Sequence, residues 1–194
     1  MGSLRFGLKV DNQDVFPYPR KGVLMNFFYE STLMPAQGNV GFTKMWFSYD
    51  WYQTYFGRHT IHPRIRFGFA DETLPITEQF SLGGQDSFYG LREDNSRGRQ
   101  LMVASLEYRY HLPVKVFFDT HISVRYDLGS IWTAPSEVRL VDLRHGIGAA
   151  LALDTPIGPV EFSLGRSFFF RKELLNDPIS LGPLLGYFSI GYAF

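Results

Sequence analysis

The sequence lacks cysteine altogether, and it has no long apolar run. None of its segments approaches the roughly 18 consecutive apolar residues that a membrane-spanning helix requires, which excludes spanning by helices. It also lacks net charge, because 19 basic residues balance 19 acidic ones, so we expect no nucleic-acid partner. The absence of cysteine fits a protein that crosses an oxidising compartment, but it fits many other proteins as well.

Aromatic residues are abundant instead. Phe, Tyr and Trp make up 17% of the 194 residues, yet hydrophobic residues as a whole reach only 45% and the mean hydropathy is -0.10. A soluble domain of this size does not need so many aromatic rings. A β-barrel that faces lipid does, because it carries an apolar outer wall with aromatic girdles at both membrane interfaces.

Strict alternation of apolar and polar residues runs through the chain. In the segment 115–127 one face carries apolar side chains and Thr, while the other carries Lys, Asp, His, Ser, Arg and Asp. Similar alternation occurs in segments 4–10, 23–30, 45–51, 61–69, 101–112, 140–154, 160–168 and 188–194. Because successive side chains of a strand point to opposite faces, this pattern predicts about eight or nine strands of an all-β, antiparallel transmembrane β-barrel.

The connections between these segments differ in length. Short turns are expected at 56–59, 111–113 and 155–159, and longer loops at 31–41, 73–99, 130–139 and 171–183. Outer-membrane barrels have short periplasmic turns and longer outer loops, and usually an even number of strands. An odd count therefore predicts that residues 1–194 form the carboxy-terminal part of a larger, 16-stranded type of barrel, and the alternative is that small chains associate into a homo-oligomer.

The carboxy terminus has a pattern of its own. Apolar or aromatic residues occupy every second position up to the last residue: Phe188, Ile190, Tyr192 and Phe194. This pattern resembles the insertion signal of outer-membrane barrels, and the alternative is an ordinary amphipathic edge strand. We therefore expect a bacterial outer-membrane location, with outer-membrane lipids around the barrel.

The long loop 73–99 contains the most specific motif. It reads Phe-Ser-Leu-Gly-Gly-Gln-Asp-Ser-Phe-Tyr-Gly-Leu-Arg over residues 80–92. It resembles the loop of the BamA/TamA-type barrel-assembly superfamily, the bacterial surface antigen barrels, in which a Gly-Gly pair precedes an Arg-Gly-aromatic tip folded back into the lumen. The pair corresponds to Gly83 and Gly84, and Gly90 matches the tip, but Tyr89 stands where Arg is expected and Leu91 where the aromatic residue is expected. By this resemblance Arg92 could supply the missing cation.

Further motifs follow in the order of that family. Tyr126-Asp127-Leu128-Gly129 resembles its Asp-x-Gly strand, which makes Asp127 the expected acidic partner of the loop and Gly129 its companion. Gly146-Ile147-Gly148 and the segment 154–159 come next, and the segments 11–14 and 19–22 resemble its Asp-rich strand-to-turn pattern. Taken singly, each glycine is also explained by a turn that needs positive φ.

Candidate catalytic groups are few. The five His residues lack the spacing of a zinc protease, and no Gly-x-Ser-x-Gly motif occurs. Asp119, His121 and Ser123 share one strand face, which is the ordinary pattern of a polar lumen. We expect no catalytic residue, no metal and no cofactor, and we interpret the inner charges, such as Arg64, Arg66, Glu107, Arg109 and Arg125, as a mutually balancing network or a hydrated path.

The resemblance implies a function for the parent protein. It would insert or translocate proteins at the outer membrane, with unfolded outer-membrane or secreted polypeptides and the barrel-assembly machinery as partners. Periplasmic or patatin-like hydrolase domains, which relatives carry ahead of the barrel, are absent from this sequence. The alternatives are a passive pore, a secretion barrel for an attached hydrolase, and an esterase with a catalytic triad at the rim.

Overall fold

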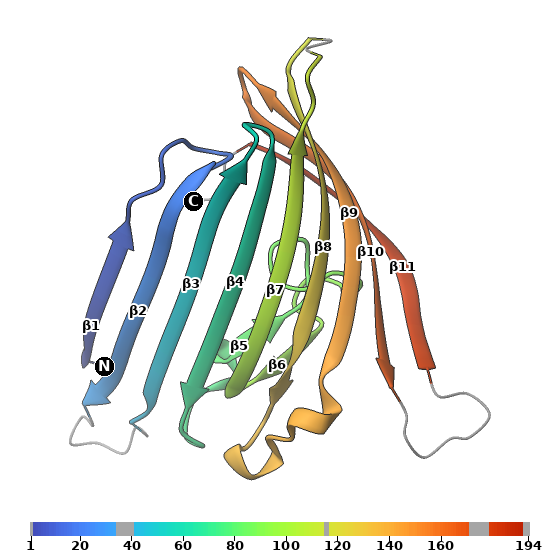
Figure 1. Ribbon diagram of the computed structural model, residues 1–194. Coiled ribbons are helices and arrows are strands. Elements are labelled where there is room, and N and C mark those ends of the chain that lie inside the picture. Colours follow the sequence, from blue (N-terminus) through green and yellow to red (C-terminus); the bar gives the residue numbers. More distant parts are fainter. Residues whose placement is uncertain (1, 34–40, 115–116, 171–178, 192–194) are drawn as a thin grey trace.

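One curved antiparallel sheet forms almost the whole molecule (Figure 1). The computed structural model describes residues 2–33, 41–114, 117–170 and 179–191. Within them, nine long strands pair in chain order: β1 (Gly2–Asp11), β2 (Lys21–Leu33), β3 (Thr43–Tyr55), β4 (His59–Ala70), β7 (Gln100–His111), β8 (Asp119–Trp132), β9 (Arg144–Thr155), β10 (Gly158–Phe170) and β11 (Ile179–Ile190). The predicted set of about nine antiparallel strands is confirmed.

The two faces of the sheet differ as the alternation predicts. On β7, Leu106 is 53% exposed on the convex face, whereas Ser105 and Arg109 are 7% exposed on the concave face. On β10, Leu164 is 58% exposed and its neighbour Ser163 is 3% exposed. The apolar side chains thus face outward, and the polar side chains face an interior that other parts of the chain fill.

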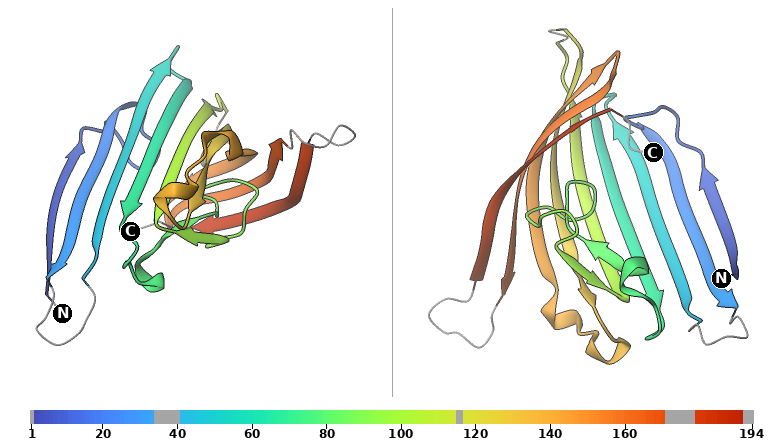
Figure 2. Two further views of the ribbon diagram at one scale, coloured as in Figure 1. Left: turned by 90° about the horizontal axis from the view of Figure 1, so that it is seen from below. Right: turned by 180° about the vertical axis from the view of Figure 1, so that it is seen from behind.

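The sheet does not close on itself within the described residues. β1 and β11 are its two edges, and neither pairs with the other. Seen from below, the strands curve around a concave side that contains the segment between β4 and β7 (Figure 2). No helix in the described part of the chain is long and apolar enough to cross a membrane.

The tight turns and the longest loop lie at opposite ends of the sheet, and the connection between β1 and β2, residues 12–20, shares the end of the tight turns (Figure 1). The two-residue turn between Thr155 and Gly158 lies at one end, and the segment between β4 and β7 leaves from the other. This is the arrangement of outer-membrane barrels, whose short turns face the periplasm and whose long loops face outward.

Several predicted boundaries were wrong. β2 and β8 extend to Leu33 and Trp132, inside the predicted loops 31–41 and 130–139, and β11 begins at Ile179, inside the predicted loop 171–183. β8 begins at Asp119, not at residue 115, and residues 115–116 lie outside the described part of the chain. β9 begins at Arg144, because Leu140–Asp142 form a 3-10 turn, η3, in which Asp142 N bonds Arg139 O. A second 3-10 turn, η2 (Pro135–Glu137), precedes it. Local i to i+3 hydrogen bonds replace sheet pairing in residues 140–142. The alternation of apolar residues includes this turn, which is why the predicted strand began too early.

The apolar core lies on the concave side, between the sheet and the long loop. Its members from the loop are Leu74, Phe80, Leu82, Phe88 and Leu91, and those from the wall and its connections are Phe42, Ala70, Leu101 and Val103, with Trp46 and Ile131 packed against them. The outer end of the lumen is therefore filled by apolar packing. That packing fixes where the tip of the loop can lie.

Candidate functional site

The loop between β4 and β7 folds back into the concave side of the sheet (Figure 2). It contains the 3-10 turn η1 (Ile76–Glu78) and a small hairpin of β5 (Phe80–Leu82) with β6 (Ser96–Gly98). The tip, residues 83–92, extends from this hairpin. Phe88 has no exposed surface and Leu91 is 5% exposed, so apolar burial holds the tip inside.

The tip has a compact backbone. Gly84 N donates to Leu91 O at 3.0 Å, and Phe88 N donates to Gly84 O at 3.0 Å. Gly90 has φ 78°, and a Cβ added to it would lie 1.9 Å from Ser167 N on β10. Only glycine allows so close an approach of the loop to the wall, which is the structural reason for the predicted tip glycine.

The backbone of the tip crosses three strands along one row of register partners. Asp127 of β8, Gly146 of β9 and Ser167 of β10 lie side by side in this row. Tyr89 N donates to Asp127 Oδ2 at 2.9 Å, and Ser167 Oγ donates to Gly90 O at 2.9 Å. Between them, a Cβ on Gly146 would come within 2.7 Å of Tyr89 O. Asp127 and Ser167 thus bind the backbone of the tip, and Gly146 between them leaves room for it. We call these three residues the seat of the loop tip.

The side chain of Tyr89 follows the next row. Arg125 of β8, Gly148 of β9 and Gly165 of β10 are register partners there. The Arg125 Cζ atom lies 3.7 Å from the centroid of the Tyr89 ring, and a Cβ on Gly148 would lie 2.4 Å from Tyr89 Cδ2. The Gly146-Ile147-Gly148 motif thus makes room for the tip. Gly165 has the same role and was missed, since a lone glycine in a strand carries no such signal.

Tyr187 of β11 completes the seat. Its hydroxyl accepts a hydrogen bond from Gly90 N at 2.9 Å and donates one to Leu91 O at 2.7 Å. Sequence reasoning missed this residue, although it is an inward aromatic with a hydroxyl inside the predicted insertion signal. Phe188 and Ile190, each 57% exposed, point outward to the lipid side, and Tyr192 and Phe194 lie outside the described residues.

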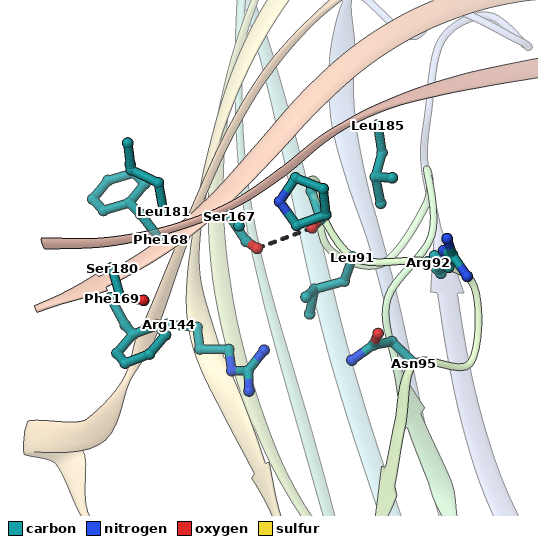
Figure 3. A pocket seen from close by; sticks show the side chains of 13 residues that line it. Leu91, Arg92, Asn95, Arg144, Ser167, Phe168, Phe169, Ser180, Leu181 and Leu185 are labelled. Atoms are coloured by element: carbon teal, nitrogen blue, oxygen red, sulfur yellow. Dashed lines mark hydrogen bonds between the residues drawn. The ribbon is translucent and has the colours of Figure 1, made fainter.

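A cavity of about 480 Å³ separates the tip from the outer half of β11 (Figure 3). Leu91 and Leu185 line it, together with Arg92, which is exposed.

The cation at the Asp127 carboxylate is Arg125, whose Nε lies 3.0 Å from Oδ1, so Arg125 makes the contact that was expected of Arg92. Gly129 lies farther along β8 and permits close pairing with Val103 of β7.

Comparison with known proteins agrees with this geometry. The family model described as the Omp85 superfamily domain matches residues 2–194. The chain belongs to the Omp85 superfamily. A crystal structure of BamA from Haemophilus ducreyi lacking POTRA domains 1-3 is similar in fold, with a TM-score of 0.72 and 20% sequence identity. The match covers 96% of this chain and 42% of that chain.

The predicted superfamily, fold class and location are therefore confirmed. This Omp85 chain is an integral β-barrel protein of the outer membrane. It spans less than half the length of the BamA chain that it resembles.

The opposite end of the Omp85 sheet carries a second inward segment. The connection between β1 and β2 reaches across to β7, where Arg109 Nη2 donates to Pro19 O at 2.6 Å. The Tyr18 ring lies 4.4 Å from the His121 ring of β8. A polar cavity of about 160 Å³ remains between Tyr18 and Tyr89. The lumen side is thus occupied from both ends.

Some inner charges of the Omp85 sheet have charged partners, whereas Arg64 Nε and Nη2 have no hydrogen-bond partner among the described residues. His62 lies 3.0 Å from Asp50 Oδ1 through Nε2 and 3.3 Å from Glu107 Oε2 through Nδ1. Arg66 Nη1 donates to Asp86 O of the loop at 2.9 Å. These contacts satisfy His62 and Arg66 in part, which lowers the cost of burying them on this face.

The strand face considered for catalysis has a packing role. Asp119 lies 3.3 Å from His111 Nε2, and the His121 ring stacks on the His111 ring at 4.8 Å. In the described residues, no group of three or more His, Cys, Asp or Glu is arranged to hold a metal ion. The site that stands out in this Omp85 sheet is therefore the seat of the loop tip.

Proposed function

We propose that this chain forms the carboxy-terminal part, residues 1–194, of the barrel of a factor that inserts or translocates proteins at the bacterial outer membrane. The observation that carries the proposal is the loop tip seated on β8, β9, β10 and β11 in an open-edged Omp85 sheet. The expected partners are outer-membrane lipids, unfolded outer-membrane or secreted polypeptides, and the barrel-assembly machinery.

The seat ties the loop to the edge of the sheet. Tyr187 lies on β11, the last strand, and Gln85 of the tip also reaches that strand by donating to Ser189 Oγ at 3.3 Å. A movement of β11 therefore changes the hydrogen bonds of the tip. This supports a role in which an edge strand moves while a polypeptide passes or pairs beside it.

The direction of the edge strands supports completion by other strands. β1 and β11 run the same way across the sheet, because they are the first and last of nine antiparallel neighbours (Figure 1). An antiparallel barrel then needs an odd number of further strands between them. A second copy inserted the same way would bring β1 and β11 together in parallel, so the proposal favours strands of different sequence over a homo-oligomer.

The filled lumen side argues against a passive pore. The loop tip enters from one end and Tyr18 from the other, and polar side chains occupy the space between them. The inner His residues pair with Asp50 and Asp119 or stack on each other, which supports a packing role for them. Secretion of an attached hydrolase remains the alternative that the same test addresses.

An insertion assay tests the proposal. The full-length protein that contains this chain is reconstituted in phospholipid vesicles, and an unfolded β-barrel substrate is added. Folding of the substrate is followed by its heat-modifiable gel mobility. We expect Gly90→Val to slow insertion strongly, because a Cβ would lie 1.9 Å from Ser167 N, whereas Gly7→Ala, whose Cβ would lie 3.6 Å from Phe27 O, should insert normally. Equal insertion by both folded variants would refute the proposal.

A further inference from the structure

Within the tip, residues 85–91 carry no cation and Arg92 is exposed, but the wall supplies a buried cation. Between Gln85 and Leu91 the only charged residue is Asp86, whereas Arg125 of β8 lies directly beneath the tip. We propose that Arg125 is the positioning residue that holds this loop in its seat. Its Nε donates to the Asp127 carboxylate, and its guanidinium lies over the Tyr89 ring. The cation is thus fixed in the wall, and the loop brings an aromatic ring to it.

The two-residue spacing of Arg125 and Asp127 makes the contact between the guanidinium and the carboxylate possible. Side chains two apart on a strand share a face, so both point to the concave side of β8. Arg125 Nε lies 3.0 Å from Asp127 Oδ1 and 3.1 Å from Oδ2. The same Oδ2 accepts the Tyr89 amide at 2.9 Å, so the guanidinium orients the carboxylate toward the backbone of the loop.

The ring of Tyr89 is held by contacts of two kinds. The Arg125 Cζ atom lies 3.7 Å from its centroid, well within the range of a cation–π interaction. Gly148 and Gly165 leave no side chain between the ring and the wall, since a Cβ on either would come within 2.8 Å of a Tyr89 atom. Arg125 is 6% exposed and Tyr89 is 2% exposed, so the attraction acts where water screens it little.

This assignment makes the identity of the two residues interdependent. An aromatic ring at position 89 needs a guanidinium at position 125, and an arginine at 89 would repel Arg125 across the Asp127 carboxylate. Exchanging the pair keeps one cation, one ring and one carboxylate at the seat. A residue that only filled space would not respond in this reciprocal way.

Cysteine labelling tests the seating directly, since residues 1–194 contain no cysteine and any cysteine elsewhere in the full-length protein is replaced by serine. Ser87→Cys places a thiol in the tip of the full-length protein in vesicles, and its reaction rate with a bulky maleimide measures how often the tip leaves its seat. We expect Arg125→Ala to raise that rate about tenfold, as expected for loss of a buried cation–π contact and a charge-assisted hydrogen bond. Arg125→Lys should fall between, because an ammonium cannot stack on the ring.

Matched variants separate this role from general stability. Arg109→Ala removes an equally buried inner arginine that binds Pro19 O of the β1–β2 connection and no atom of the tip, so it should leave labelling unchanged, as should Tyr89→Phe, which keeps the ring. Tyr89→Arg and Arg125→Tyr should each raise labelling, and the double exchange should restore it. Gel mobility without heating checks that each variant is folded.

Two outcomes would overturn the proposal: labelling of Arg125→Ala at the rate of Arg109→Ala, or a double exchange no better than its worse single variant. If the exchange variants do not fold, the labelling rates of Arg125→Lys and Tyr89→Phe decide. An unchanged rate for Arg125→Lys, or a raised rate for Tyr89→Phe, would then overturn the proposal. The inference deepens the proposed function but is measured without substrate. Loose seating with unchanged substrate insertion would therefore refute the proposed function and leave the assignment of Arg125 standing.

Discussion

Removing the hydroxyl of Tyr187 should loosen the loop tip from the last strand. In Tyr187→Phe the Gly90 amide loses its acceptor, and Leu91 O loses one donor but keeps Gly84 N at 3.0 Å. The cost is thus mainly one buried amide left unpaired, about 2 kcal/mol. Because ~1.4 kcal/mol is a factor of ten, the open population of the tip should rise roughly thirtyfold.

Hydrogen exchange measured by mass spectrometry in micelles reads this population at the Gly90 amide. The control is Tyr108→Phe, which removes a hydroxyl that lies 2.6 Å from His59 Nδ1 on the outer face, away from the loop. We expect faster exchange in peptides covering the tip only for Tyr187→Phe. Equal exchange in the two variants would refute the reasoning that β11 holds the tip through this hydroxyl.

Three further predictions concern the seat, the outer wall and the lumen. Gly148→Val should push Tyr89 off the wall at a cost of about 1–3 kcal/mol and make the loop sensitive to protease, and an equally resistant loop would contradict the seat. Val124→Arg, on the outer face near the middle of β8, should lower the free energy of unfolding in urea by about 2–4 kcal/mol while Val124→Leu does not, and equal midpoints would contradict a lipid-facing position. The full-length protein should show low conductance in planar bilayers, raised in Gly148→Val, and a large steady conductance of the unaltered protein would contradict a filled lumen.

Much of the fold could be predicted because it depends on local alternation. Leu106 and Ser105 differ in polarity, and that difference alone assigns the two faces of β7. Strand ends were less predictable, since the apolar positions of residues 140–143 continue the pattern although a 3-10 turn replaces sheet pairing there. Hydrophobic periodicity predicts the face of the sheet on which a side chain lies. It does not predict the residue at which hydrogen bonding to the neighbouring strand begins or ends.

The candidate site was only partly predictable. The Gly-Gly pair, Gly90 and Asp127 were found from motifs, and the structure brings Gly90 and Asp127 into one seat with Tyr89. Arg125, Gly165, Ser167 and Tyr187 were not singled out as partners of the tip. Each belongs to a different part of the chain from the loop, and each looks like an ordinary inward residue of a strand. Their role arises from register, which aligns residues of β8, β9 and β10 in rows.

The sequence by itself determined that the chain forms membrane-facing antiparallel strands, because the period of two is a property of each strand alone. The resemblance of one motif to the superfamily's loop implied an inward loop with a glycine at its tip between the fourth and fifth long strands. Only the tertiary structure decided that the cation at the tip comes from Arg125 in the wall, and not from Arg92 in the loop. The physical reason is that a guanidinium acts through space over a few ångströms, and those distances are set by sheet register and loop packing.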